Sequence, residues 1–238
     1  MNTAQQLQHL LGLARPPVAV TFRDSAPAGV AKVEASGPSS CSYWKLAAEG
    51  RTFYTEAADH YNCPIGAYTH GVDAPPHVMK ELEGVISTMV SLGYLRAEEV
   101  PGIPRRPGPF RVAVYGPLAQ MDAAPDVVIV AGNPRQVMLL AEAAGAAGVG
   151  GPGLMGRPTC AALPQAMQTG QGVASLGCIG NRVYTELGDD ELYFALPGQE
   201  LNAVVEKLDR IVHANSELEK YHREKLSAIS HQPSASQG

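Results

Sequence analysis

DVVIVA, residues 126–131, is the stretch of sequence that decides the fold. It is an almost continuous apolar run, and such a strand is typically covered by helices on both faces, as in a parallel sheet. Asn133 and Pro134 follow it and indicate an N-cap and a first-turn proline, so a helix is expected to about Ala144. A buried strand that leads directly into a helix predicts an α/β protein.

A second apolar strand is expected at 18–22, and we predict that both strands are central in a mixed, mainly parallel sheet. Hydrophobic spacing and turn residues predict further helices and strands on either side. The helices are expected at 7–11, 41–49, about 77–92, 160–168 and 199–225, and the strands at 51–57, 111–115, 173–176 and 191–196. We expect a single α/β domain over 1–229, with possible halves 1–100 and 110–229, and a disordered tail at 230–238.

Composition limits the classes of function. The chain has 238 residues, of which 45% are hydrophobic and 17% are charged, and this is enough to bury a substantial core. Its net charge of −5 and the lack of a long basic run argue against a nucleic-acid partner. No secretory signal or apolar run long enough for a membrane span is visible, so a soluble, cytoplasmic protein is expected.

The four cysteines are the residues that carry the most chemistry. In the reducing cytosol, Cys41, Cys63, Cys160 and Cys178 should be free thiols rather than disulfides. Their surroundings recur, because each half reads as a helix that begins at a cysteine, a glycine, a strand and a second cysteine before a glycine-containing turn. The cysteines of each half are 22 and 18 positions apart. We infer an internal duplication that relates the two pairs by an approximate two-fold axis.

These positions predict thiolates that converge on a shared centre. Cys41 and Cys160 begin helices, where the helix dipole lowers a thiol pKa. Cys63 and Cys178 end strands, and Gly66 and Gly180 beside them would let the backbone approach a bound cofactor. Four thiolates suit a [4Fe–4S] cluster or a tetrahedral zinc ion. The lack of a Cys-x-x-Cys pair also leaves two separate sites or a catalytic thiol open.

Several neighbouring residues have two interpretations each. His60, with Glu56 and Asp59, could complete a mixed ligand set or lie exposed at the surface. Arg182 could bind a carboxylate or phosphate beside Cys178. Trp44 could shield the Cys41 thiol or pack in the core. The remaining expectations are surface positions for His70 and His77, and core positions for the methionines of the helix after Pro76.

The glycine-rich segment 148–153 matches the dinucleotide-binding fingerprint only in its letters. That fingerprint needs a strand before it and a helix directly after it. Here the segment follows a predicted helix and contains Pro152. A mobile loop over the Cys160 region is therefore the better interpretation.

Several motifs together resemble a known family, the domain of unknown function 169 family of archaea and bacteria. They are Pro17-Val18-Ala19-Val20, Cys41 with Trp44, Ala47 and Gly50, His60 with Cys63 and Gly66, Tyr115-Gly116-Pro117-Leu118, Pro125-Asp126-Val127-Val128 with Asn133-Pro134, and Gly177-Cys178-Ile179-Gly180-Asn181-Arg182. The resemblance runs from about Leu7 to Leu208. It implies one structural unit and names no reaction.

Three functions follow from these observations. The first is a cysteine-ligated metal or iron–sulfur protein with a redox or cofactor-handling role, which would meet a small molecule or a redox partner. The second is a thiol-dependent enzyme that uses Cys178 or Cys41 as its nucleophile on a small anionic substrate held by Arg182. The third is a non-catalytic small-ligand-binding module whose cysteines are simply buried.

Overall fold

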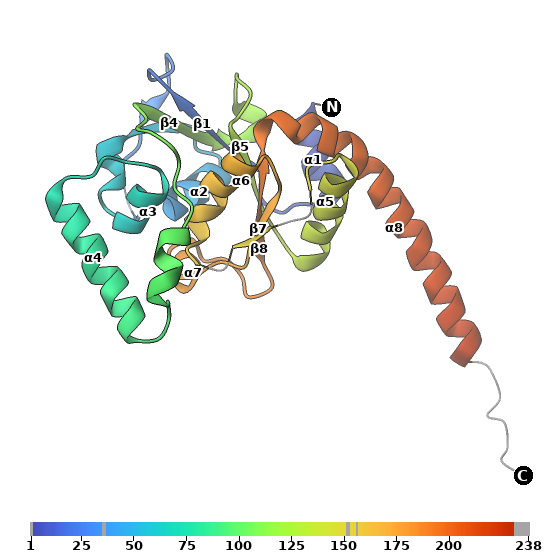
Figure 1. The fold of residues 1–238 in the computed structure, drawn as a ribbon. Coiled ribbons are helices and arrows are strands. Elements are labelled where there is room, and N and C mark those ends of the chain that lie inside the picture. The colour runs from blue at the N-terminus through green and yellow to red at the C-terminus, as the bar shows by residue number, and fades with distance from the viewer. Residues whose placement is uncertain (1, 35–36, 151–152, 156, 231–238) are drawn as a thin grey trace, which may run out of the picture.

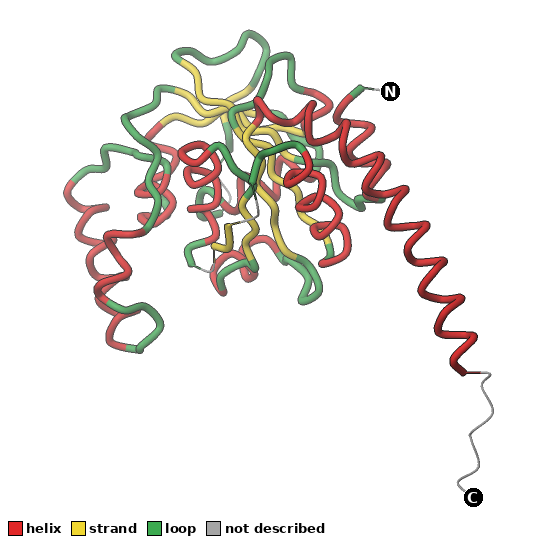
Figure 2. The backbone as a smooth tube through the Cα atoms, turned by 45° about the vertical axis from the view of Figure 1, so that its right-hand side comes forward, coloured by secondary structure: helices red, strands yellow, loops and turns green. Residues whose placement is uncertain are grey.

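A computed structural model describes residues 2–34, 37–150, 153–155 and 157–230. In these residues eight strands form one mixed sheet, in the order β2-β3-β4-β1-β5-β8-β7-β6 (Figures 1 and 2). The strands are β1 (Val18–Arg23), β2 (Ala31–Lys32), β3 (Phe53–Glu56), β4 (Val112–Pro117), β5 (Val127–Gly132), β6 (Gly153–Met155), β7 (Val173–Ser175) and β8 (Leu192–Pro197). An α/β fold in one compact unit is therefore confirmed.

Helices cover both faces of the sheet (Figure 1). On one face lie α1 (Thr3–Leu11), α5 (Pro134–Ala146) and α8 (Leu201–Ser230), which pack on one another. On the other lie α2 (Cys41–Ala48) and α6 (Ala162–Thr169), with α3 (Pro64–Thr69) and α7 (Ile179–Thr185) beyond them. Short 3₁₀ turns link the elements: η1 (Ala57–His60), η2 (Ala97–Gly102), η3 (Leu118–Gln120), η4 (Thr159–Ala161) and η5 (Gly198–Glu200).

The two apolar strands are central, as predicted, because β1 and β5 are the fourth and fifth strands of the sheet. In β1, Val18 and Val20 pack into the core beneath α2 and α6. Ala19 points to the opposite core, with α1, α5 and α8. Burial on both faces explains why neither strand alternates with polar residues.

The expectation of a mainly parallel sheet is wrong. Both central strands pair antiparallel with all their neighbours, and the parallel pairs are β2 with β3 and β6 with β7 at the two edges. An apolar strand shows that both faces of the sheet are covered, but it does not show whether neighbouring strands run parallel or antiparallel. The apolar pattern therefore identified the layers correctly and the strand direction incorrectly.

The strand arrangement repeats between the two halves of the chain. From edge to centre the first half runs β2-β3-β4-β1 and the second β6-β7-β8-β5. The register repeats as well. Phe53 pairs with Ala31 and Tyr115, and at the equivalent position Val173 pairs with Gly153 and Ala195. This is the arrangement expected of an internal duplication.

Two backbone hydrogen bonds show how closely the halves correspond. Leu118 N–H donates to the carbonyl of Pro17, just before β1, over 2.8 Å. Gly198 N–H donates to the carbonyl of Asp126, just before β5, also over 2.8 Å. In the central β1–β5 pair, Ala19 faces Val128, and the flanking pairs are reciprocal. An approximate two-fold axis therefore passes between Ala19 and Val128.

One arm of the molecule breaks this symmetry. In the first half, α4 (Pro76–Ser91) and η2 are inserted between α3 and β4, and α4 packs on α3 at the margin of the fold (Figure 1). In the second half, α7 is joined to β8 by residues 186–191 alone. The methionines of α4 are not core residues, since Met79 is 40% exposed and Met89 borders a cavity.

The ends of several elements follow from local chemistry. Asn2 and Gln5 form a capping box on α1, and Gly12 ends that helix in the left-handed conformation. Asn133 and Gln136 form the predicted cap of α5. The glycine-rich segment contributes β6, whereas Gly151 and Pro152 lie outside the described residues. None of the helices in the described chain is both long and apolar enough to cross a bilayer.

The C-terminal helix is longer than predicted. It reaches Ser230, and its second part extends away from the sheet (Figures 1 and 2). Its packed residues, such as Val204 and Leu208, belong to the first turns, where the helix covers α1 and α5. Of the disordered tail predicted at 230–238, Ser230 is the last residue of α8 and 231–238 lie outside the described residues.

Candidate functional site

All four cysteines border one cavity of about 310 Å³. Cys41 is the first residue of α2, and Cys160 lies in η4, directly before α6. Cys63 and Cys178 are the N-caps of α3 and α7. The two cysteines of the first half therefore occupy places equivalent to those of the second. One lies at the start of the helix that packs under the sheet, α2 or α6, and the other follows the next strand, β3 or β7.

The cavity forms where the two halves cross. The helix α2 of the first half packs against α7 of the second, and α3 of the first packs against η4 of the second. Two hydrogen bonds from a backbone N–H to a side-chain oxygen hold the cysteine segments in place. Cys178 N–H donates to Thr159 Oγ1 over 2.6 Å, and Ser39 N–H donates to Asn62 Oδ1 over 3.0 Å. Each of these bonds lies within one half, so the contact between the halves comes from the packing of α2 on α7 and of α3 on η4.

The predicted lowering of the thiol pKa values is wrong. Burial raises the pKa of Cys41 to about 12 and that of Cys160 well above its ordinary value. Burial also raises the pKa of Cys63. Cys41 and Cys160 are only 7% and 5% exposed, so the loss of hydration outweighs the helix dipole at these positions. The raised pKa values favour neutral thiols at pH 7.

Three of the sulfurs nevertheless meet hydrogen-bonding groups. Gly66 N–H donates to Cys63 Sγ over 3.4 Å. The side chains of Asn181 and Thr69 interact with Cys41 and Cys160, and each opposes part of the pKa rise that burial causes. Both interactions cross between the halves, because Asn181 belongs to α7 and Thr69 to α3.

Asn181 is an unusual member of the cavity wall. Its side chain is buried, with the residue only 1% exposed. Neither its amide nitrogen nor its amide oxygen has a partner of ordinary hydrogen-bond geometry among the described residues. A buried, unpaired amide costs free energy, so such a group in a folded protein needs an explanation.

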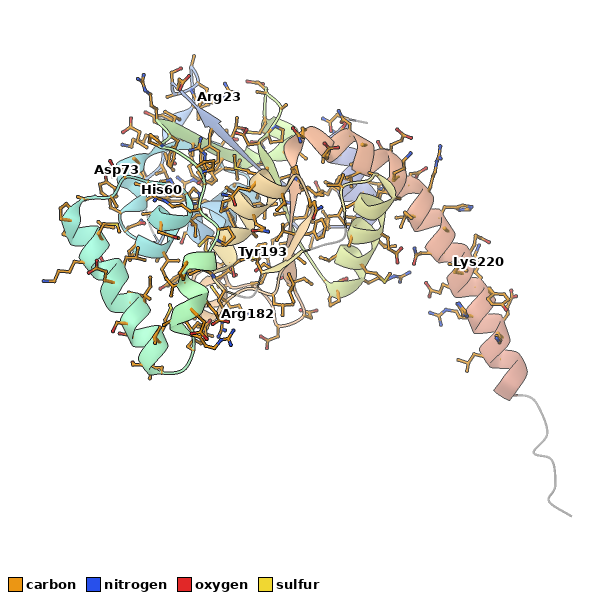
Figure 3. All side chains as sticks on the ribbon, in the orientation of Figure 1. Arg23, His60, Asp73, Arg182, Tyr193 and Lys220 are labelled. Carbon is orange, nitrogen blue, oxygen red and sulfur yellow. The ribbon has the colours of Figure 1, made fainter. Side chains whose placement is uncertain are left out.

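The predicted mixed ligand set does not assemble. His60, labelled in Figure 3, is completely buried. Its Nε2 is 2.9 Å from Thr55 Oγ1. Glu56 and Asp59 instead form ion pairs with Lys32, at 2.7 and 3.3 Å. Across the described ranges, no three Cys, His, Asp or Glu side chains are grouped so that they could hold one metal ion.

The surface position expected for His70 is wrong, whereas His77 is exposed as expected. His70 is completely buried and its ring centroid is 4.8 Å from that of His60. Its Nδ1 bonds to the carbonyl of Gly66 at 3.0 Å and its Nε2 to the hydroxyl of Tyr115 at 3.1 Å. Burial lowers the pKa of His70 to about 4 and that of His60 well below its usual value.

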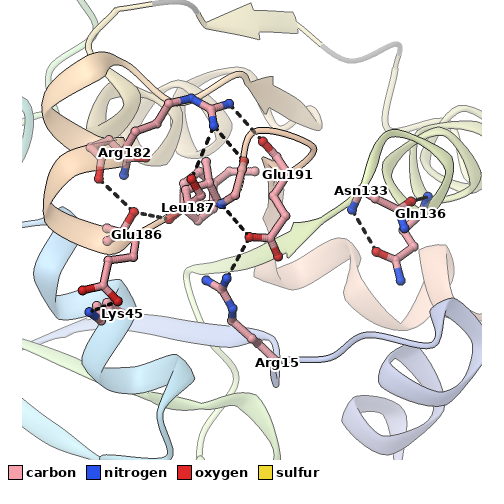
Figure 4. Close-up of polar contacts among 12 residues, drawn as sticks. Arg15, Lys45, Asn133, Gln136, Arg182, Glu186, Leu187 and Glu191 are labelled. Carbon is pink, nitrogen blue, oxygen red and sulfur yellow. Dashed lines mark hydrogen bonds and ion pairs between the residues drawn. The ribbon is translucent and has the colours of Figure 1, made fainter.

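Arg182 has a structural role that the sequence did not reveal (Figure 4). Its guanidinium donates to four backbone carbonyls, at 2.6 to 3.5 Å, and these belong to Leu176, Leu187, Gly188 and Glu191. Guanidinium has five N–H donors, so one is left for the predicted anion. Arg182 therefore joins α7 to the turn before β8.

The other predicted residues divide between the cavity and the core. Gly180 borders the cavity. Gly66 packs so closely on the Ser39 segment that a Cβ would lie 2.5 Å from the Ser39 carbonyl oxygen. Trp44 packs edge-on against Tyr193, with ring centroids 5.5 Å apart, and belongs to the core beneath the sheet. Core packing is therefore the correct interpretation of Trp44.

Sequence reasoning assigned no role to Asn181, which borders the cavity, or to Thr69, which lies beside Cys160. Asn181 had a visible signal, since it lies three positions after Cys178 at the start of a short helix. Thr69 had none, because its place beside Cys160 depends on how α3 packs against the other half.

The sequence profile of the domain of unknown function 169 family, described as "Uncharacterised ArCR", matches residues 6–207. The chain belongs to this family. The match spans both halves, all four cysteines and the inserted arm. A relative in Methanocaldococcus jannaschii, "Uncharacterized protein MJ0308", is 27% identical over 227 residues, which cover 87% of this chain and 93% of the relative. No solved structure matches this member of the domain of unknown function 169 family.

Proposed function

We propose that the four cysteines bind a thiolate-ligated metal cofactor, with an iron–sulfur cluster as its form, and that the protein serves in electron transfer or cofactor handling. The observation that carries the proposal is the shared cavity, to which each half contributes two cysteines from equivalent positions. Four cysteines are the usual ligand set of [2Fe–2S] and [4Fe–4S] clusters.

Hydrogen-bond donors near the sulfurs support the proposal. A neutral cysteine that only fills space in a core needs no such donor, because it behaves as a small hydrophobe. Here Gly66 N–H donates to Cys63 Sγ over 3.4 Å, and the amide of Asn181 lies beside Cys41. Donors of this kind stabilise metal-bound thiolates and adjust cluster potentials.

The lack of a compact ligand group among the described residues is the reason to propose a cluster over a single zinc ion. Tetrahedral zinc needs four sulfurs at about 2.3 Å from one atom. The described side chains do not form such a group without movement, whereas a cluster of several metal atoms bridges sulfurs that are farther apart. The cofactor would have to displace the thiol protons, so loading should improve as pH rises.

Anaerobic reconstitution with ferrous iron and sulfide tests the proposal. The expected result is stoichiometric iron and acid-labile sulfide, with visible absorbance that dithionite bleaches. Cys→Ala and Cys→Ser at each of the four positions should lower the iron content. Ala143→Ser is the matched control, because it places a hydroxyl in the opposite, fully buried core and removes no sulfur.

Two results would contradict the proposal. A Cys63→Ser protein that keeps full metal content would show that Cys63 is not a ligand. A wild-type protein that takes up one zinc ion, and neither iron nor sulfide under anaerobic conditions, would replace the cluster by a mononuclear site.

A further inference from the structure

We propose that the cavity also binds a small, neutral organic molecule with an apolar body and one group that both donates and accepts hydrogen bonds, such as a carboxamide. This inference goes beyond the cofactor and does not depend on it. Three features of the wall carry it: an aliphatic side, an unpaired buried amide, and the lack of an available cation.

The aliphatic side belongs to the inserted arm. Leu82, Val85, Ile86 and Met89 of α4, with Val100 and Ile103 at η2, face the same cavity as the four cysteines. A thiolate-bound metal needs no such wall, and the second half of the chain has no equivalent arm. A volume of about 310 Å³ lies at the lower end of the range of small-molecule sites, roughly 300–1,000 Å³.

The polar group of the ligand is read from Asn181. This residue borders the cavity, and its Nδ2 donor and Oδ1 acceptor both lack a partner in the described structure. A carboxamide offers one acceptor and one donor in a plane, which is the complement of the asparagine amide. Both atoms are buried beside the cavity, so a carboxamide that reaches them would satisfy both at once, whereas a hydrocarbon would leave both unpaired.

The charges at the wall favour a neutral ligand. The charged side chains that border the cavity are Glu81 and Arg157. The Arg157 guanidinium donates to the Tyr94 carbonyl, lies 4.7 Å from the Tyr94 ring centroid and is 3.8 Å from a Glu99 oxygen. It is therefore already paired, and Glu81 would repel an anion. A carboxylate would lose its hydration without gaining a free cation.

Three probes of similar size, benzamide, benzoate and toluene, test the roles of the Asn181 amide, the charges and the aliphatic side separately. Binding is measured by calorimetry on the full chain at pH 8, where benzoate is an anion. We expect benzamide to bind at least tenfold more tightly than either of the others. Asn181→Leu should lower the affinity for benzamide to that for toluene. Asn202→Leu, on the exposed side of α8, should leave the affinity for benzamide unchanged.

A second variant tests the aliphatic side. Ile86→Trp enlarges a residue of the arm, away from the sheet, and should abolish binding of benzamide and toluene while circular dichroism stays unchanged. Equal affinities for the three probes, in both wild type and Asn181→Leu, would overturn the proposal. So would a failure of all three probes to bind to the folded wild-type protein.

The two proposals fail separately. The probes are tested on the reconstituted protein and on protein treated with a chelator, and benzamide should bind in both states. Benzamide binding by a protein that takes up no metal would contradict the cofactor alone. A cluster-loaded protein that selects none of the probes would contradict the organic ligand alone.

Discussion

The amide of Asn181, from the second half of the chain, lies against the thiol of Cys41, from the first half. Burial raises the pKa of Cys41, and the interaction with Asn181 offsets part of that rise. The same amide has no hydrogen bond of ordinary geometry within the described structure. Asn181 is therefore kept at a cost to stability, as expected of a residue selected for its effect on a sulfur or a ligand.

Asn181→Leu should stabilise the metal-free protein. Leucine has a similar size and removes two unpaired buried polar atoms, so we expect the free energy of unfolding to rise by about 1–2 kcal/mol. Urea titrations of the wild type and the variant measure the change. A loss of stability would show that the asparagine amide is paired in solution.

The metal-free thiol of Cys41 should be unreactive at neutral pH. A pKa of about 12 instead of 9.0 lowers its thiolate fraction at pH 8 about a thousandfold. We therefore expect iodoacetamide to modify Cys41 far more slowly in the folded protein than in urea, with mass spectrometry to locate the label. Rapid labelling of folded, metal-free protein would contradict the burial of this thiol.

The buried histidines should weaken the fold in acid. Burial holds the pKa of His70 at about 4, below the ordinary 6.5, so the unfolded chain takes up this proton first as pH falls. The stability that depends on keeping these histidines neutral is fully present above pH 6.5 and is lost as pH falls towards 4. For His70 this loss in the free energy of unfolding is on the order of 3 kcal/mol.

Urea titrations between pH 7 and pH 4 measure this loss. His70→Gln should flatten the pH dependence of unfolding, and His77→Gln, at an exposed position, should not. An identical acid loss in wild type and His70→Gln would assign the effect to other groups.

Two glycines should respond oppositely to alanine. A Cβ at Gly198 would lie 1.7 Å from the carbonyl oxygen of Pro125, so Gly198→Ala should cost at least about 2 kcal/mol. Gly84, inside α4, has open space around the same position, and Gly84→Ala should stabilise by about 0.5–1 kcal/mol. Thermal melts of both variants check the sign. An unchanged melting temperature for Gly198→Ala would contradict the close contact between Gly198 and the Pro125 carbonyl.

Arg182→Lys should affect stability and leave the cofactor in place. Lysine cannot reproduce the bonds to four carbonyls, so we expect a loss of about 1–2 kcal/mol, because part-buried acceptors lose their donors. Iron content after reconstitution should equal that of the wild type. If the variant had normal stability but bound less iron, Arg182 would have a role in binding the cofactor.

The sequence predicted the parts of this structure that depend on local pattern. The apolar runs at β1 and β5 located the centre of the sheet, and the repeated cysteine surroundings indicated two related halves. Strand direction was mispredicted because it depends on how elements connect in space. The two edge strands, β2 and β6, were missed, because two and three residues near glycines show no periodic pattern.

The sequence drew attention to the four cysteines that border the cavity, and it mispredicted the pKa shifts of Cys41 and Cys160. Sequence position placed Cys41 at a helix start, but the degree of burial, which sets its pKa, follows from the packing of α2 against α7. The role of Arg182 was missed for a similar reason, since its partners are backbone carbonyls that residue identities do not reveal.

The reciprocal pairing of β1 and β5 around Ala19 and Val128 has a consequence for the origin of the chain. A single half would present its innermost strand as an open sheet edge, which invites pairing with another copy. Two identical copies joined across that edge would form an isologous dimer with this same antiparallel contact. Fusion of two such copies into one gene would let the halves diverge in sequence, which accounts for an arm of α4 and η2 in the first half alone.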